Sequence, residues 1–301
     1  MASMQVWAYR YYVSTDSISY LDMSDAVFSG TGWHRLITGT WSPLYPFLLG
    51  LGRLLHPDPY REIVTGHLMN IPRFLAAFAA FEFFLRNVVP REEISDVARE
   101  HVFLPRWVYL VVGYTLFLWA SIAAITLRTL RADMLMATFL LLAMGMLFRI
   151  KWQGGTWARY LTLGVILGFG YLAKAPLLSI GVLILASSLL LAGDWSRTLP
   201  KALLSGIVFL AIGSLYFIPL SQKQGDLTLG ESSSYNYLIH VDRPGNAWYL
   251  QQVGKGSGRF LHSATKIFDE PAVYQFSVGQ PVTYPMRFDP AYWAQGVKPR
   301  F

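Results

Sequence analysis

The hydrophobic residues of this chain gather in six long apolar runs that occupy its middle. A membrane-spanning helix needs about 20 mostly apolar residues, because the hydrocarbon layer is about 30 Å thick and a helix rises about 1.5 Å per residue. The pattern predicts an all-α polytopic membrane protein, with two of the runs short and meeting near Lys174. The six predicted spans are Ile63–Leu85, Trp107–Thr126, Met134–Ile150, Trp157–Ala173, Ala175–Leu191 and Ala202–Leu220.

The segments on either side of these runs differ in character. Pro43–Leu55 is apolar but short and carries Arg53, so we expect an amphipathic helix in the membrane interface. A full span there is the alternative, and it would invert the topology. The tail 221–301 is polar, and its strand-like pieces Tyr235–Val241 and Ala272–Val278 predict a small extracytoplasmic α+β or irregular segment. The chain thus divides into an outer acidic loop with interfacial helices (1–62), a helix bundle (63–220) and a polar segment (221–301).

Composition excludes an ordinary soluble enzyme and charge orients the spans. Only 14% of residues are charged, against about 25% in soluble domains. The net charge is +7, but the basic residues are spread between apolar runs, which favours positive cytoplasmic loops over nucleic-acid binding. The opposite side, predicted to be extracytoplasmic, holds 16–40, the turn 127–133, Lys174 and the tail. The basic residues assigned to the cytoplasmic side are Arg86, Arg91, Arg99, Arg106, Arg149, Lys151, Arg159, Arg197 and Lys201.

Three carboxylates lie within ten residues of the first outer loop, at Asp16, Asp22 and Asp25. On a helix Asp22 and Asp25 would share a face, and Asp16 would lie just before it as an N-cap. Asp16 either only caps that helix or serves as a general base or an anchor for a cation.

Two further charged residues lie at ends of predicted spans on the same side. Asp133 opens a spanning helix, where it either stabilises the helix N-terminus or faces Asp16 across a site. Lys174 lies at a break between two apolar helices, where it either reaches the interface or receives a phosphate. Gly164 and Gly168 are spaced for close helix packing. The six histidines show no metal-binding spacing, and the chain has no cysteine.

The order of these features resembles that of the GT-C membrane glycosyltransferases, and is closest to bacterial glycosyltransferase family 39 and the related protein mannosyltransferase and aminoarabinose transferase branches. An acidic outer loop is followed by the aromatic, proline-rich segment Trp41–Pro46, then by Asp133 before a helix, then by a Gly-x-x-x-Lys-x-Pro break at Lys174. The likeness covers roughly residues 10–220. It implies a GT-C-type transmembrane helix bundle in the bacterial inner (plasma) membrane, with its active face extracytoplasmic.

The resemblance also implies roles for single residues. Asp16 occupies the position of the first catalytic acid, Asp133 that of the second, and Lys174 that of the lysine that holds the donor phosphate. Ser17 follows Asp16 where those families commonly have another acid. Tyr20 and Asp22 fall in the same loop as supporting residues, and Arg73 is a second candidate for the phosphate. A spanning helix would precede the loop in these families and more would follow the tail, so the chain is expected to lack segments at both ends.

The expected reaction transfers a sugar from a polyprenyl-phosphate-linked donor to a lipid, glycan or protein acceptor beside the membrane lipids. A lipid phosphate is already a leaving group, so the chemistry requires a base for the acceptor hydroxyl and a cation for the departing phosphate. No cofactor is required, although a divalent cation held by Asp16 and Asp133 is compatible with the sequence. The alternatives are a transporter or flippase that uses Arg73 and Glu82 within its spans, and a non-catalytic membrane subunit.

Overall fold

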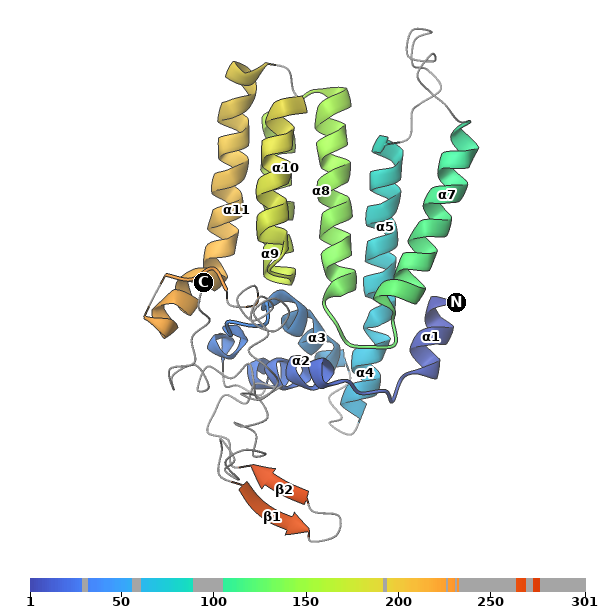
Figure 1. Cartoon of the computed structure of the whole chain (residues 1–301), viewed down its shortest axis with the longest axis vertical. Helices are drawn as coiled ribbons and strands as arrows, with labels where there is room; N and C mark the ends of the chain where they lie inside the picture. The colour runs from blue at the N-terminus through green and yellow to red at the C-terminus, as the bar shows by residue number, and fades with distance from the viewer. Residues whose placement is uncertain are drawn as a thin grey trace, which may run out of the picture.

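The computed structural model describes residues 1–28, 32–55, 61–88, 105–191, 194–225, 227–230, 232, 264–268 and 273–276. These residues are mostly helical, and six helices stand side by side as a bundle (Figure 1). Within the bundle α9 packs between α8 and α11, while α5 packs along α8 and contacts α7. The six helices are α5 (Asn70–Val88), α7 (Arg106–Trp119), α8 (Asp133–Gln153), α9 (Trp157–Ala173), α10 (Leu177–Leu191) and α11 (Trp195–Gln224).

Four helical regions of the described residues are long and apolar enough to cross a membrane: Glu62–Val88, Arg106–Ile125, Asp133–Gln153 and Trp195–Lys223. They form part of a polytopic helical bundle, as the hydropathy pattern predicts. The other two predicted spans are helices too, but α9 has 17 residues and α10 has 15, or about 26 and 22 Å at 1.5 Å per residue. These are the two runs predicted to be short, and Lys174 and Pro176 divide that apolar stretch as expected.

Two of the predicted spans are interrupted in ways the pattern did not indicate. The first is split at Met69 into α4 (Glu62–Leu68) and α5. Pro72 lies in the first turn of α5, where its missing N–H needs no partner, so the helix restarts just before it. The second ends in a π-helical turn, η4 (Ala120–Ile125), and then leaves the helix at Thr126.

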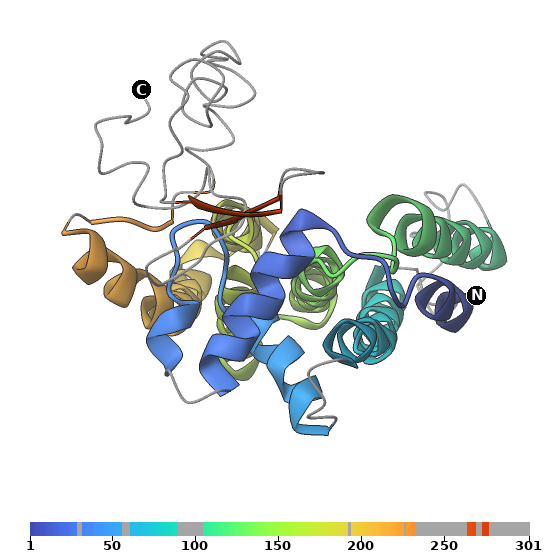
Figure 2. The same cartoon turned by 90° about the horizontal axis from the view of Figure 1, so that it is seen from below.

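Short helices lie at one end of the bundle, the lower end in Figure 1. They are α1 (Ala2–Ala8), α2 (Thr15–Ala26), the 3₁₀ turn η2 (Trp33–Leu36), α3 (Leu44–Leu55) and α4. Figure 2 shows α2 running across this end when the bundle is seen from below. The predicted amphipathic helix is confirmed as α3, which packs against α2, α4 and α9 rather than standing among the long helices.

Glycines let α9 approach α11 closely. A Cβ at Gly164 would lie 2.5 Å from the carbonyl oxygen of Ser205, and one at Gly168 would lie 2.6 Å from Cβ of Ile212. The predicted close packing at these two glycines is confirmed. Around this contact the buried core of α8 to α11 includes Tyr160, Leu163, Leu167, Tyr171 and Phe209.

The tail contains one described antiparallel pair of strands, β1 (Ala264–Phe268) and β2 (Val273–Phe276). β2 lies inside the strand-like piece predicted at 272–278, so that strand is confirmed. The other predicted piece, 235–241, lies outside the described residues.

Candidate functional site

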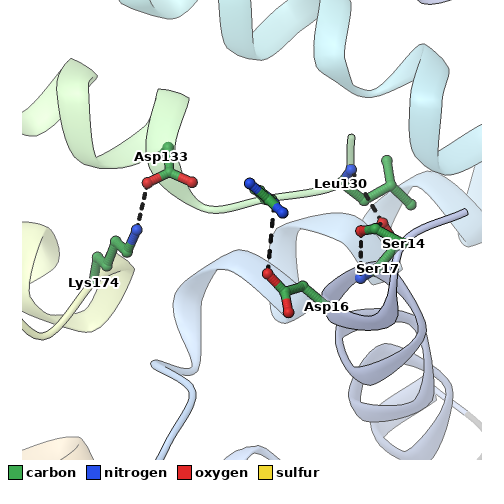
Figure 3. A network of polar contacts seen from close by, with 7 residues as sticks. Ser14, Asp16, Ser17, Leu130, Asp133 and Lys174 are labelled. Carbon is green, nitrogen blue, oxygen red and sulfur yellow. Dashed lines mark hydrogen bonds and ion pairs between the residues drawn. The ribbon is translucent and has the colours of Figure 1, made fainter. Parts of the chain in front are cut away.

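Four charged side chains meet at the lower end of the bundle as two ion pairs, and we call Asp16, Arg131, Asp133 and Lys174 the rim cluster (Figure 3). Nζ of Lys174 donates to Oδ1 of Asp133, and Nε of Arg131 lies 3.5 Å from Oδ2 of Asp16. Arg131 and Asp133 are two residues apart, so their Cα atoms are within about 7 Å. The structure thus places the three predicted residues Asp16, Asp133 and Lys174 at the same end of the bundle.

Lys174 owes its place to the break between α9 and α10. Its backbone is extended, with φ −160° and ψ 130°, and its N–H closes the last turn of α9 on the carbonyl of Gly170 at 3.0 Å. Pro176 disfavours helical geometry for the residue before it, so α9 cannot run on into α10. The side chain, 34% exposed, is therefore free to reach Asp133 at the start of α8.

Asp133 is delivered by the loop 126–132, which joins η4 to α8. The carbonyl of Leu127 accepts from Nδ2 of Asn70 at 2.8 Å, and the N–H of Leu127 donates to Oε1 of Gln5 at 3.0 Å. Further along, the N–H of Leu130 donates to Oγ of Ser17 at 3.3 Å. Three elements, α1, α2 and α5, thus hold this loop through side chains.

Asp16 lies in the first turn of α2 but does not cap it. The N-cap is Ser14, whose Oγ accepts from the N–H of Ser17 at 3.3 Å. The predicted capping role of Asp16 was therefore wrong, because a serine two residues earlier supplies the oxygen. Its carboxylate, 31% exposed, instead faces Arg131.

Tyr20 lies near the rim cluster, in a buried group of aromatic rings that shares a core with Leu130 and Ala132 of the loop. Its ring centroid is 4.6 Å from that of Tyr45 and 4.9 Å from that of Trp41. Burial raises the pKa of Tyr20 well above its usual value, and the neighbouring carboxylates of Asp133 and Asp16 add to the effect. Tyr20 therefore stays a neutral phenol close to both acids.

Two other candidates have their described partners outside the rim cluster. Arg73 is 7% exposed, and its guanidinium lies 4.6 Å over the Tyr45 ring while donating to acceptors of its own helical region. Asp22 is half-buried near Glu62, and burial followed by the charge of Glu62 raises its pKa to about 6. Asp25 pairs with Arg53, so the face shared by Asp22 and Asp25 turns toward α3 and α4.

The charges of the rim cluster balance, since each carboxylate has a cationic partner. A divalent ion held by Asp16 and Asp133 would have to take both from those partners. Within the described residues, no group of three or more acidic, histidine or cysteine side chains could hold a metal ion. The cluster as it stands presents two cations, which can bind an anionic group, and two carboxylates, which can accept a proton from a hydroxyl group.

Sequence reasoning missed Arg131, a basic residue in the turn 127–133 on the side predicted to be extracytoplasmic. That position was the available signal, because basic residues of short loops are favoured on the cytoplasmic side, so a cation in this turn needs a local reason to be there. Comparison with family models, with curated proteins and with solved structures finds no match to this chain.

Proposed function

We propose that the chain transfers a sugar from a polyprenyl-phosphate-linked donor to an acceptor hydroxyl at the extracytoplasmic face of the bacterial inner membrane, as the GT-C resemblance implies. The observation that carries the proposal is the rim cluster. Two carboxylates and two cations from three separate segments lie at one end of a membrane helix bundle. A base for a hydroxyl and cations for a departing phosphate are the groups such a transfer needs.

In this mechanism the donor phosphate binds Lys174 and Arg131 and takes them from their carboxylates. Asp16 then accepts the proton of the acceptor hydroxyl. The hydroxyl oxygen forms a bond to the anomeric carbon while the bond from that carbon to the phosphate oxygen breaks. The phosphate leaves with the electron pair, its charge balanced by the two cations, and a single in-line displacement inverts the anomeric centre. Asp133 orients Lys174, and Tyr20 supports the loop.

The test is sugar transfer in membranes that contain the chain, with a polyprenyl-phosphate-linked sugar as donor. Asp16→Asn should lower the rate constant by about 100-fold or more, as expected for loss of a general base. Asp194→Asn is the matched control, because Asp194 is an exposed acid before α11, at the opposite end of the bundle. Undiminished transfer by Asp16→Asn would remove the mechanism.

The placement of ionisable residues in α5 argues against the transporter alternative. Arg73 lies in the first turn of α5, whereas Glu82 lies nine residues further, or about 13 Å along the axis, and pairs with Arg86 at 3.4 Å. The two residues thus lie at different levels of the helix, more than two turns apart, rather than together at one level. Substrate accumulation in vesicles without covalent transfer would favour the transporter. A non-catalytic subunit would tolerate loss of Asp16.

A further inference from the structure

Asn70, the first residue of α5, joins that helix to the loop that carries Arg131 and Asp133. Its side chain is 3% exposed, and Nδ2 donates to the carbonyls of Leu127 and Thr129, at 2.8 and 3.4 Å. Buried backbone carbonyls in an irregular loop need partners, and here one amide serves two of them. Asn70 therefore fixes the backbone of the loop two to four residues before Arg131.

Arg73, one helical turn after Asn70, determines how that amide points. Its Nη2 donates to Oδ1 of Asn70 and to the carbonyl of Gly66, and its Nε donates to the carbonyl of Met69 at 2.9 Å. A guanidinium has only donors, and a backbone carbonyl has only acceptors. The Asn70 oxygen must therefore face Arg73, which leaves the amide N–H groups facing the loop.

The same guanidinium also supports the aromatic group near the rim cluster. It lies over the face of Tyr45, and the Tyr45 ring packs edge-on against Tyr20. Arg73 thus contacts both the residue that holds the loop and the ring that supports Tyr20.

We infer that Arg73 and Asn70 form a positioning pair that holds the 126–132 loop, and through it Asp133 and Arg131, in register with Asp16 and Lys174. Arg73 acts here through Asn70 and touches neither donor nor acceptor. The kinetic consequence of this inference rests on the proposed glycosyl transfer, whereas its structural consequence does not.

The structural consequence can be measured without any substrate, because the chain has no cysteine and a single introduced thiol reports one position. Thr129 is 7% exposed, so the thiol of Thr129→Cys should react slowly with a polar maleimide in the purified protein. Adding Asn70→Leu should speed labelling about tenfold, since the loop loses two hydrogen bonds. The matched control is Asn87→Leu, which removes an amide that donates to the carbonyl of Phe83 within α5. If Thr129→Cys labels at the same rate when combined with Asn70→Leu as when combined with Asn87→Leu, the inference is overturned.

Two milder variants keep the test decisive if Asn70→Leu does not fold. Asn70→Asp keeps an acceptor for Arg73 but cannot donate to the loop carbonyls when ionised, so it should label as fast as Asn70→Leu. Arg73→Lys keeps one donor for Asn70 and should give an intermediate rate. Slow labelling in both variants would contradict the positioning role.

Kinetics separates positioning from direct phosphate binding. Because a misplacement of about 1 Å can cost about 100-fold in rate, we expect Asn70→Asp to lower kcat between 10- and 100-fold while the donor KM changes little. If Arg73 instead binds donor phosphate, Arg73→Lys would raise the donor KM, Asn70→Asp would not change kcat, and the inference would fail. If the unaltered chain transfers no sugar, the proposed function fails, and the labelling rates alone still decide whether the pair holds the loop.

Discussion

At the scale of single residues, the rim cluster alternates negative and positive charge from Asp16 through Arg131 and Asp133 to Lys174. All four side chains are between 31% and 47% exposed. Ion pairs with that much solvent contribute about 0.2–1 kcal/mol each. A phosphate offers several charged acceptor oxygens, so it can replace a carboxylate as the partner of either cation. The pairs are therefore suited to exchange partners when an anionic donor arrives.

Arg131→Gln tests this exchange. The variant keeps a polar side chain but loses the charge, so we expect the donor KM to rise about tenfold through loss of a charge-assisted contact. Arg128→Gln is the control, because Arg128 lies in the same loop but is exposed and faces Tyr9 at 6.0 Å. Steady-state transfer at varied donor concentration measures both. Equal KM values for the two variants would show that Arg131 does not meet the donor.

The raised pKa of Asp22 predicts how the stability of the folded protein depends on pH. Burial and the neighbouring charge of Glu62 raise its pKa to about 6, above the ordinary value of 3.8. The folded state therefore holds the proton on the Asp22 carboxyl more tightly than the unfolded state does. The stabilisation that this proton gives the folded state is complete below pH 3.8 and is lost as pH rises through 6. After allowance for solvent screening, Asp22→Asn should raise stability at pH 7 by on the order of 1 kcal/mol.

Thermal unfolding in detergent between pH 4.5 and 7.5 checks this expectation. The difference in Tm between Asp22→Asn and the unaltered chain should grow as pH rises. Asp194→Asn is the control, because the hydroxyl of Ser196 and the backbone N–H of Arg197 lower the pKa of Asp194. Asp194 therefore stays ionised across this range, and the Tm difference of its variant should not change with pH. A Tm difference between Asp22→Asn and the unaltered chain that stays constant across this range would show that Asp22 does not titrate there.

At the scale of elements, the contact between α9 and α11 depends on what each glycine faces. Gly164 meets the backbone carbonyl of Ser205, which cannot swing aside as a flexible side chain can. Gly206 lies on α11 beside Ser205, yet a Cβ there would meet only Leu185, at 3.9 Å. Two glycines in neighbouring helices therefore have opposite tolerance for a methyl group.

Gly164→Ala should destabilise the bundle by about 1–3 kcal/mol, because the helices must separate to admit the methyl group. Gly206→Ala should be neutral, or stabilising by about 0.5–1 kcal/mol, because alanine is the better helix former. The Tm values of the two variants in the same detergent measure the difference. A fall in Tm for Gly206→Ala as large as that for Gly164→Ala would contradict the packing argument.

At the scale of the whole molecule, hydropathy predicted the helices and their order well, because each spanning segment must satisfy its own backbone hydrogen bonds. The break at Lys174 was also predictable, since Pro176 lies two residues beyond it. The restart of the helix at Asn70 was less visible, because proline is tolerated in a first turn and Pro72 could equally have bent a continuous helix.

The candidate site was predictable only in part. Asp16, Asp133 and Lys174 were assigned to one side from the order of the spans, and the structure places them at one end. Their partners were not predictable, because the pairing of Arg131 with Asp16 joins positions more than a hundred residues apart. The choice between Ser14 and Asp16 as the N-cap of α2 could not be made either, since both residue types cap helices well.

Basic residues in the terminal turns of three long helices lead us to predict a direction for the molecule. Arg86 lies in the last turn of α5, Lys151 in the last turn of α8 and Arg197 in the first turn of α11. These helix ends share the upper end in Figure 1. The rim cluster lies at the other end. Because basic residues are retained on the cytoplasmic side, the rim cluster should face outward, as the proposed acceptor chemistry requires.

Single cysteines test this direction in intact cells. Arg128→Cys and Lys151→Cys introduce exposed thiols at the lower and upper ends of the bundle. A membrane-impermeant maleimide should label only Arg128→Cys, whereas Lys151→Cys should become reactive after the membrane is permeabilised. Each variant serves as the control for the other, since both place a thiol at an exposed former basic position. Labelling of Lys151→Cys alone in intact cells would turn the rim cluster toward the cytoplasm, where a donor and acceptor on the outer face could not reach it.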